Sequence, residues 1–455
     1  MRVAVVGGGI AGLAAAWEAL AQWPDAQVTI HEPGRLGGKI RTTPFAGHPV
    51  DEGPDAFLTR VPDAIALCAQ LGLDADLVAP AAGSSMLWWA GRLRPLPDGL
   101  VLGVPRRLGP VLRSGLLSWR GAIRAAGDLV LPRTPMPAGG DVSVRALVAS
   151  RFGVEVADRL VDPLVGGIHA GRTDQLSASA TVPQLVAAAG RSRSLLRGLA
   201  AAPGSADGPV FLTPAGGMGV LVDTLVGALT ARGVSVATDR VRSVEPAGAG
   251  RLVVAGEVVD ACVLAVPAGE AAALVAGASP DAAAGLRQVG YAGVVLTTMA
   301  FPADAAHLPP GVNGFLVPRS EGRLMTACSF ASSKWPHWAD PGTALVRASA
   351  GRHLDSRALD LDDDRLVDAL VDELSAALGR RLPAPSGARV SRWPAAFPQY
   401  TVGHLRRLAG IEAALGRDLP AVALAGAGTR GSGIPACIAS GRGAAHRLLA
   451  AAPTA

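Results

Sequence analysis

The most constraining feature of this 455-residue chain is a glycine-rich turn at its start. Residues Arg2 to Val6 have the pattern of a buried parallel strand, the glycines follow at once, and an alanine-rich helical stretch runs from Leu13 to Gln22. In this context Gly7 allows a tight turn, Gly9 lets the backbone approach a pyrophosphate, and Gly12 lets the helix pack closely on the strand. The pattern predicts a Rossmann-like dinucleotide-binding unit whose turn consists of Gly7, Gly8, Gly9, Ile10, Ala11 and Gly12.

A carboxylate after the next strand strengthens this prediction. The second strand is expected over Gln27 to Ile30, and Glu32 follows it, twenty residues past Gly12. A carboxylate at that spacing can accept hydrogen bonds from an adenosine ribose. The alternative is an ordinary glycine turn with a surface glutamate, and the combination of strand, turn, helix and acid disfavours it.

The bulk composition indicates a large, compact, multi-domain protein. Hydrophobic residues make up 49% and charged residues 17%, and there are 57 glycines, which excludes a disordered or fibrous chain. The net charge of +5 comes from arginines scattered along the chain. It could suit an anionic substrate or an acidic membrane surface, or it could belong to an ordinary solvated surface. We expect no nucleic-acid partner.

Cysteine usage and hydropathy predict a cytoplasmic protein. The four cysteines are far apart, with no CxxC pair and no adjacent histidines, so neither a disulfide framework nor a metal site is expected. The first residues lack the pattern of a signal peptide. The apolar stretch 253–266 is interrupted by Glu257 and Asp260, and the stretch 291–303 is too short to cross a bilayer. Membrane contact is expected to be peripheral at most, on the inner face.

The segments after the second strand resemble those of the flavin amine oxidase superfamily. Residues 35–41 (RLGGKIR) and 51–57 (DEGPDAF) match its RxGG and GP segments. The resemblance implies FAD, and we expect it to be bound non-covalently. Residues 234–244, 261–267, 423–428 and 434–438 match its later segments. The further cofactor-binding residues that the resemblance implies are Arg35, Gly38, Lys39, Gly53, Pro54, Asp55, Ala56, Val241, Trp393, Gly426, Gly431, Ser432, Gly433 and Ile434.

Two segments in the middle and late chain narrow the resemblance. Residues 162–171 (DPLVGGIHAG), followed by Leu176 and Ser177, and residues 398–404 (PQYTVGH) are similar to segments of the protoporphyrinogen oxidase family. The similarity runs from Val3 to about Leu449. It implies a porphyrinogen substrate, hydride transfer from its methylene bridges to flavin N5, and O2 as the acceptor that regenerates the flavin with release of H2O2.

Residues 326–328 and 334–337 resemble the coproporphyrinogen III oxidase branch, whose members precede a ferrochelatase. The other branch, which acts on protoporphyrinogen IX, places an arginine near Ser84 and Ser85. The branch assignment implies a wide, polar pocket with Leu316 apolar and with small Ala327 and Ser349. The expected carboxylate anchors are Arg172, Arg319 and Lys334.

The resemblance leaves the catalytic residues open. The carbonyls of Ala170 and Gly171 are candidates for holding pyrrole N–H groups. His169, expected in a loop, is a candidate proton acceptor, although a structural hydrogen-bonding role is the alternative. Cys437 is expected to be an apolar filler. Protoporphyrinogen IX as substrate, another flavin amine oxidase or desaturase activity, and a non-catalytic flavin-binding scaffold are the competing hypotheses for the chain as a whole.

The expected fold is α/β: a discontinuous Rossmann-like FAD-binding domain, a mixed α+β substrate-binding domain and a helical insertion domain. The FAD domain is predicted over 1–75, 208–270 and 418–455, the substrate domain over 76–97 and 271–417, and the insertion over 98–207. Residues 200–209 have the composition of a linker. Apolar residues and arginines between 102 and 117 could form a cationic face for a membrane or partner, or could pack on their own domain.

Overall fold

The computed structural model describes residues 1–132, 140–201 and 208–451. The chain divides into two compact units. The first consists of Met1–Ala79, Pro209–Gly290 and Leu405–Ala455, and the second of Pro80–Gly208 and Tyr291–His404. The second unit therefore includes residues 98–207, and the boundaries of the three expected domains stay predictions. The core of the expected linker, 202–207, lies outside the described residues.

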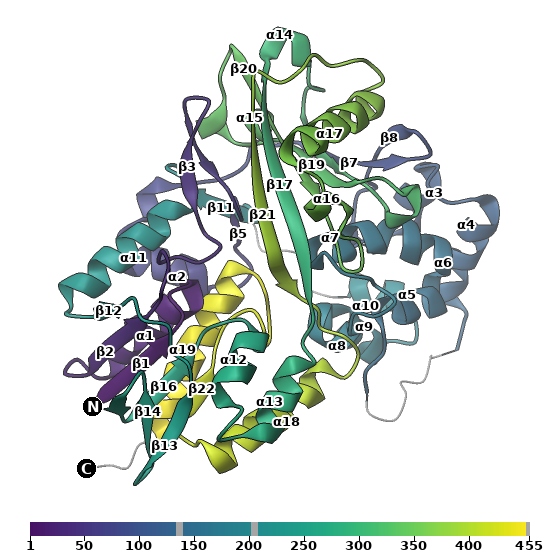
Figure 1. Cartoon of the computed structure of the whole chain (residues 1–455). Coiled ribbons are helices and arrows are strands. Elements are labelled where there is room, and N and C mark those ends of the chain that lie inside the picture. The colour runs from purple at the N-terminus through teal and green to yellow at the C-terminus, as the bar shows by residue number, and fades with distance from the viewer. Residues whose placement is uncertain (133–139, 202–207, 452–455) are drawn as a thin grey trace. The chain divides into compact units, whose positions relative to one another are not determined.

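The first unit is built on a parallel sheet of five strands in the order β12-β2-β1-β16-β22 (Figure 1). Every neighbouring pair in it is parallel. The sheet confirms the α/β prediction, and its strands are β1 (Arg2–Val6), β2 (Gln27–His31), β12 (Ser235–Ala237), β16 (Ala261–Leu264) and β22 (Val422–Leu424).

The helices of the first unit are α1 (Ile10–Gln22), α2 (Asp63–Gln70), η1 (Asp74–Asp76), α11 (Gly219–Ala231), α12 (Ala268–Val275), α13 (Pro280–Arg287), α18 (His404–Asp418) and α19 (Ile434–Ala451). Its smaller sheets contain β3 (Thr42–Phe45), β4 (His48–Asp51), β5 (Phe57–Leu58), β6 (Leu77–Val78), β11 (Phe211–Pro214), β13 (Val244–Gly248), β14 (Arg251–Val254) and β15 (Glu257–Val259).

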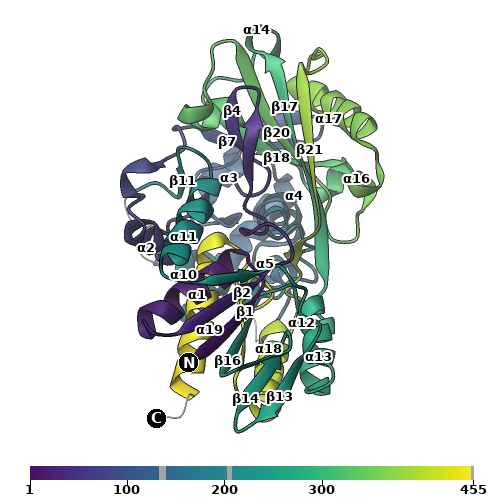
Figure 2. The ribbon, with the colours of Figure 1, turned by 60° about the vertical axis from the view of Figure 1, so that its left-hand side comes forward.

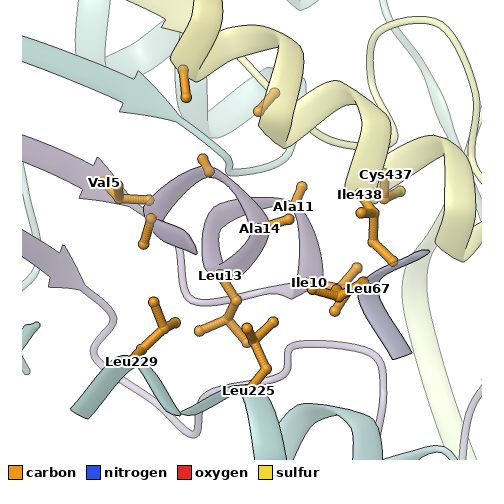
Figure 3. Close-up of a cluster of buried hydrophobic side chains, with 14 of the residues drawn as sticks. Val5, Ile10, Ala11, Leu13, Ala14, Leu67, Leu225, Leu229, Cys437 and Ile438 are labelled. Carbon is orange, nitrogen blue, oxygen red and sulfur yellow. The ribbon is translucent and has the colours of Figure 1, made fainter. Parts of the chain in front are cut away.

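Helix α1 lies at the centre of this unit's core. Figure 3 shows Leu13 directed toward Leu225 and Leu229 of α11, while Ile10 lies beside Leu67 of α2 and Ile438 of α19. All of these side chains are buried. Because α1 is surrounded on several sides, the turn that precedes it is held in place by packing along the whole helix.

The second unit contains a mixed sheet of seven strands in the order β21-β17-β20-β19-β18-β7-β8. Only the pair of β18 and β7 is parallel among these neighbours. The long strands β17 and β21 lie side by side in Figure 2. The strands are β7 (Ser84–Trp89), β8 (Arg92–Pro95), β17 (Tyr291–Pro302), β18 (Val312–Leu316), β19 (Met325–Phe330), β20 (Thr343–Ala350) and β21 (Gly387–Pro398).

One face of this sheet is covered by helix α17 (Asp363–Leu378). Its buried residues Leu366, Leu370 and Leu374 recur every four positions and pack with sheet residues such as Met299 and Val346. The shorter elements near the sheet are α14 (Ala303–Ala306), η4 (Arg319–Glu321), α15 (Ala331–Lys334), η5 (Pro336–Trp338) and α16 (Arg357–Asp360).

The rest of the second unit is mainly helical. It begins with the short strands β9 (Leu100–Val101) and β10 (Val104–Pro105). Its helices are α3 (Leu108–Arg113), α4 (Trp119–Ala126), η2 (Gly127–Leu129), α5 (Val144–Phe152), α6 (Val154–Val156), the π-helix η3 (Ala157–Gly166), α7 (Gly167–His169), α8 (Ala178–Thr181), α9 (Pro183–Arg191) and α10 (Leu195–Ala200).

Several of the residues considered for a cationic face lie inside this helical cluster. Val104, Val111 and Leu116 are fully buried in it, so these three pack on their own unit. Leu112 is exposed, and so are Trp119 and Ile123 on one face of α4 and Val130 after η2. In the part of the chain that the structure describes, no helix is both long enough and apolar enough to span a membrane.

Candidate functional site

The glycine turn between β1 and α1 has a conformation that depends on its glycines. Gly7 has a φ of +104°, which favours glycine. A side-chain carbon added at Gly12 would overlap the Gly7 carbonyl oxygen, so α1 can start here only with glycine. At Gly9 the same added carbon would have no described atom within 4 Å. The described part of the chain leaves the space in front of Gly9 open, and this is where a ligand can approach the backbone.

Glu32 is held by the backbone of the same region. Its carboxylate accepts hydrogen bonds from the Gly8 N–H at 2.9 Å and from the Gly34 N–H at 3.0 Å. A carboxylate has about four acceptor sites, so two of them remain for the hydroxyl groups of a ribose. The two backbone donors orient the side chain toward the turn, because Gly8 belongs to it.

The second glycine pair lies against the first turn. Gly37 donates its N–H to the Gly8 carbonyl at 2.8 Å, and a side-chain carbon at Gly38 would lie 3.2 Å from the Gly9 Cα atom. The Arg35 guanidinium donates to the Ile40 carbonyl at 2.5 Å, which closes the loop between them. The structure thus places Gly37 and Gly38 of the RxGG segment next to the turn.

Lys39 is a partly buried cation in this region. Burial lowers the pKa of its ammonium group, and the nearby Cys437 partly opposes that shift. Burial in turn raises the pKa of the Cys437 thiol to about 11, so the thiol is protonated at neutral pH. A desolvated ammonium group beside the glycine turns suits an anionic ligand.

The remaining cofactor candidates of the first unit lie in three segments. Residues Gly53, Pro54, Asp55 and Ala56 follow β4. The preceding Asp51 accepts hydrogen bonds from the Met218 N–H at the start of α11 and from the Thr42 hydroxyl. Val241 is buried between β12 and β13. Gly426, with a φ of +98°, and Gly431, Ser432, Gly433 and Ile434 connect β22 to the start of α19.

The candidate substrate residues of the second unit share one face of the seven-stranded sheet. Leu316 pairs with Ala327, Ala327 with Ser349, and Ser349 with Leu296, and directly opposite residues point to the same side. This row lies on the face opposite α17. Ala170 packs on Val294 and Leu296 beside it, and Trp393 pairs with Val294. The structure therefore brings these candidates together from five separate segments.

The two segments that carry the porphyrinogen oxidase resemblance lie side by side. The Gln399 amide donates to the His169 carbonyl at 3.0 Å, and the Ser177 N–H donates to the Tyr400 carbonyl at 2.7 Å. Asp141 joins them further by accepting from the Ser177 hydroxyl and the Gly403 N–H. These hydrogen bonds fix the conformation of residues 169–177.

The segment around His169 is helical, so the expectation of a loop there is wrong. The π-helix η3 passes directly into α7, which ends at His169. Burial lowers the pKa of the His169 imidazole to about 4, so the ring is neutral at pH 7. Its Nδ1 atom has no hydrogen-bond partner in the described part of the chain.

The carbonyls of Ala170 and Gly171 already accept hydrogen bonds from the protein. The Ala170 carbonyl accepts from the His353 N–H at 2.6 Å, and the Gly171 carbonyl accepts from the Arg319 guanidinium at 3.1 Å. Each carbonyl has a second lone pair that a pyrrole N–H could use. Ala170 itself has a φ of +45°, which turns its carbonyl away from the helix axis.

The three expected carboxylate anchors differ in their surroundings. Arg172 forms a two-point ion pair with Asp174, with N–O distances of 3.0 and 2.6 Å, and both side chains are more than a third exposed. The Lys334 ammonium lies 4.7 Å from the Trp335 ring centroid. Arg319 is half-buried at the 170–171 turn. Its guanidinium contacts a candidate substrate residue, because it donates to the Gly171 carbonyl.

Sequence reasoning missed Arg352 and His353. They follow β20, and His353 contacts the Ala170 carbonyl through its backbone. A glycine at 351 with a φ of +86° turns the chain after the strand. The sequence does show two basic residues directly after this glycine. Their neighbours in the fold, however, come from the segment around Ala170, some 180 positions earlier in the chain.

Comparison with known proteins places the chain in a family. Residues 10–449 match the family described as flavin-containing amine oxidoreductase, and the chain belongs to this family of flavin-dependent oxidoreductases. The FAD-type sheet and glycine turn agree with that membership. Among the described residues no cluster of histidine, cysteine or acidic side chains could hold a metal ion.

Several relatives carry more specific names. The chain is 36% identical to a coproporphyrinogen III oxidase of Mycobacterium bovis, covering 96% of this chain and 95% of the relative. It is 32% identical to that of Bacillus subtilis, with 98% of each covered. A solved candidate protoporphyrinogen oxidase from Exiguobacterium sp. 255-15 superposes with a TM-score of 0.87 at 29% identity, with 98% of each chain covered.

The open space at Gly9 generates a test of the cofactor site. We expect Gly9→Val to fold with a melting temperature near that of the parent, because no described atom lies where the new side chain begins. It should nevertheless lose most of its bound flavin, because the side chain occupies the pyrophosphate's space. Flavin content per protein, read from the absorbance spectrum, is the measurement.

The control for this experiment is Gly12→Val, whose side chain would collide with the Gly7 backbone and should lower the melting temperature as well. Glu32→Ala should retain more flavin than Gly9→Val, because it loses hydrogen bonds worth about 1.5 to 3 kcal/mol but blocks nothing. Full flavin occupancy in Gly9→Val contradicts the assignment of this turn.

Proposed function

We propose that this flavin-dependent oxidoreductase oxidises coproporphyrinogen III to coproporphyrin III. The proposal rests on one observation: the chain is 32 to 36% identical, over almost its full length, to proteins named coproporphyrinogen III oxidase. A protoporphyrinogen oxidase from Bos taurus matches at 29% over 99% of both chains, so protoporphyrinogen IX is the second candidate substrate. The small side chains of Ala327 and Ser349 on the sheet face support the more polar and bulkier substrate.

The cofactor is proposed to be FAD, bound without a covalent bond. The open space at Gly9, the backbone-held Glu32 carboxylate and the partly buried Lys39 ammonium fit a pyrophosphate with an adenosine ribose. Cys437 is the cysteine closest in sequence to the glycines at the start of α19. Its thiol stays protonated because burial raises its pKa to about 11, and a protonated thiol is a poor nucleophile.

The protein's own part in the proposed reaction is binding, orientation and proton transfer. When bound, a flavin supplies the acceptor for a hydride from a methylene bridge of the substrate, and O2 finally takes up the electrons as H2O2. The carbonyls of Ala170 and Gly171 would orient a pyrrole ring through its N–H group. After the bridge C–H bond breaks, the pyrrole nitrogen loses its proton, and the neutral His169 imidazole is the proposed acceptor.

Non-covalent binding is tested by acid precipitation of the purified yellow protein. We expect all of the flavin in the supernatant and the mass of FAD for the released compound. Flavin that stays in the protein pellet contradicts non-covalent binding, and release of FMN instead contradicts the assignment of Glu32 to an adenosine ribose.

The substrate is tested by comparing kcat/KM for coproporphyrinogen III and protoporphyrinogen IX under air, followed by porphyrin fluorescence. We expect a preference of at least about tenfold for coproporphyrinogen III, because a site built for a carboxylate rejects an uncharged vinyl group strongly. Measuring H2O2 in the same assay checks the acceptor. A preference for protoporphyrinogen IX would contradict the proposed substrate and would assign the protein to the protoporphyrinogen oxidase branch.

The role of His169 is tested through the pH dependence of kcat/KM. The imidazole must be neutral to accept a proton, so activity should be lost only as pH falls through about 4, and it should be flat from pH 6 to 8. An imidazole at its ordinary pKa would instead lower the rate between pH 7 and 6. His169→Gln should reduce kcat about 100-fold or more without changing flavin content. A variant with the parent's kcat would remove His169 from the reaction.

A further inference from the structure

Basic side chains gather around the 170–171 turn of the second unit. The Arg319 guanidinium donates to the Gly171 carbonyl at 3.1 Å. The backbone N–H of His353 donates to the Ala170 carbonyl at 2.6 Å, which places the neighbouring Arg352 at the same turn. Arg319 and Arg352 are close enough for their like charges to interact unfavourably. Such a pair of cations needs compensation.

The nearby carboxylates form their ion pairs and hydrogen bonds with groups other than the guanidinium groups of Arg319 and Arg352. Asp174 forms its ion pair with Arg172, and Asp355 forms a two-point ion pair with Arg357, with N–O distances of 2.8 and 2.9 Å. The third carboxylate, Asp162, accepts from the hydroxyl of Thr173 at 2.7 Å. No described carboxylate forms a hydrogen bond with Arg319 or Arg352.

Both unpaired guanidinium groups are also poorly hydrated. Arg352 is only 9% exposed, and within the described residues its guanidinium makes one hydrogen bond, a long one of 3.5 Å to the Arg323 carbonyl. The Nε atoms of Arg319 and Arg352 are buried and have no hydrogen-bond partner in the described part of the chain. Burial is the main cause that lowers the pKa of each group. Buried cations without a counter-charge are costly, and a bound anion removes that cost.

We propose that Arg319 and Arg352 form a carboxylate-binding subsite that holds a propionate of the porphyrinogen. The proposal rests on the function proposed above and names two residues that fix the orientation of its substrate. Arg352 was not among the anchors expected from the sequence. The expected anchor Arg172 already binds the Asp174 carboxylate through its guanidinium.

The position of the subsite fits the chemistry of the substrate. A pyrrole ring that donates its N–H to the 170–171 turn carries its propionate only a few bonds away. Arg319 is bonded to that same turn, so its remaining N–H groups can meet the carboxylate. Two guanidinium groups can bind a carboxylate with several charge-assisted hydrogen bonds, which a methyl, vinyl or ester group cannot accept equally well.

The His353 side chain belongs to the same environment. Burial and the charges of Arg319 and Arg172 lower its imidazole pKa, so it is neutral near pH 7. The carboxylates that face the cluster are Asp162, Asp174 and Asp355. A bound propionate adds one negative charge and should therefore raise the pKa of His353, which gives a readout that is independent of turnover.

The test compares Arg319→Gln and Arg352→Gln with the matched control Arg357→Gln in the flavin-loaded full chain. All three remove one positive charge from the same cluster, but Arg357 is already paired with Asp355. Affinity is measured by fluorescence titration with coproporphyrin III and, in the same detergent-containing buffer, with its tetramethyl ester. Melting temperatures verify folding, and Arg352→Lys retains the charge if Arg352→Gln is unstable.

We expect coproporphyrin III to bind about 10- to 100-fold more weakly to the Arg319 and Arg352 variants, the range for loss of a charge-assisted hydrogen bond. The Arg357 variant should change affinity by less than about threefold, and the ester should bind all proteins alike. The parent should also show a higher His353 pKa, by NMR titration, with coproporphyrin III than without it. Arg352→Lys should lie between parent and Arg352→Gln.

Two outcomes overturn the proposal in distinguishable ways. If the parent binds coproporphyrin III and both glutamine variants bind it equally well, or lose affinity for acid and ester alike, the subsite is wrong and the proposed function stands. If the parent itself does not bind coproporphyrin III, the proposed function is wrong and the subsite falls with it.

Discussion

The backbone-to-backbone packing of helix α1 is the constraint on which the cofactor unit depends. Gly12 lets α1 begin directly against the Gly7 carbonyl oxygen, and Gly441 lets α19 approach the Ala11 carbonyl oxygen. A side-chain carbon at either glycine would overlap the oxygen that it faces. With α1 held between α11 and α19, the turn has a fixed shape before any ligand arrives. The only glycine of this turn whose added carbon meets open space is Gly9, among residues the structure describes. Preorganisation of this kind lowers the ordering cost of binding.

In the second unit, hydrogen bonds rather than glycine contacts hold the candidate site in a fixed conformation. Its candidate substrate segment is helical, and a π-helix leads into it. Gln399 and Ser177 connect it to the chain more than 200 residues later, and Asp141 fixes both segments by accepting from Ser177 and Gly403. The carbonyls of Ala170 and Gly171 therefore point in defined directions. Replacing Asp141 would disturb their orientation without removing a group that meets the substrate.

Buried polar groups of the second unit differ in whether the described part of the fold supplies their hydrogen-bond partners. Asp128 and Arg151 are both buried and form an ion pair, and Asp128 also accepts from two backbone N–H groups at the start of α10, so their charges are satisfied within the fold. The Arg319 and Arg352 guanidinium groups retain unpartnered Nε atoms, and the His169 imidazole retains an unpartnered Nδ1 atom, in the described chain. Such groups cost stability and are tolerated where a ligand completes their hydrogen bonds.

The sequence by itself determined the cofactor unit and the family. Local patterns specify its strands, the glycine turn and the helix that begins at Ile434, because each depends on neighbouring residues and on glycine's lack of a side chain. It also indicated the segments around Ala170 and Gln399, but it misjudged the first as a loop, since a π-helix with a proline at position 163 has no regular apolar period. Only the tertiary structure decided that Leu316, Ala327 and Ser349 form one row, that Asp174 occupies Arg172, and that Arg352 joins Arg319. Strand register and long-range ion pairing depend on contacts between distant segments, and a single sequence does not encode these in any local pattern.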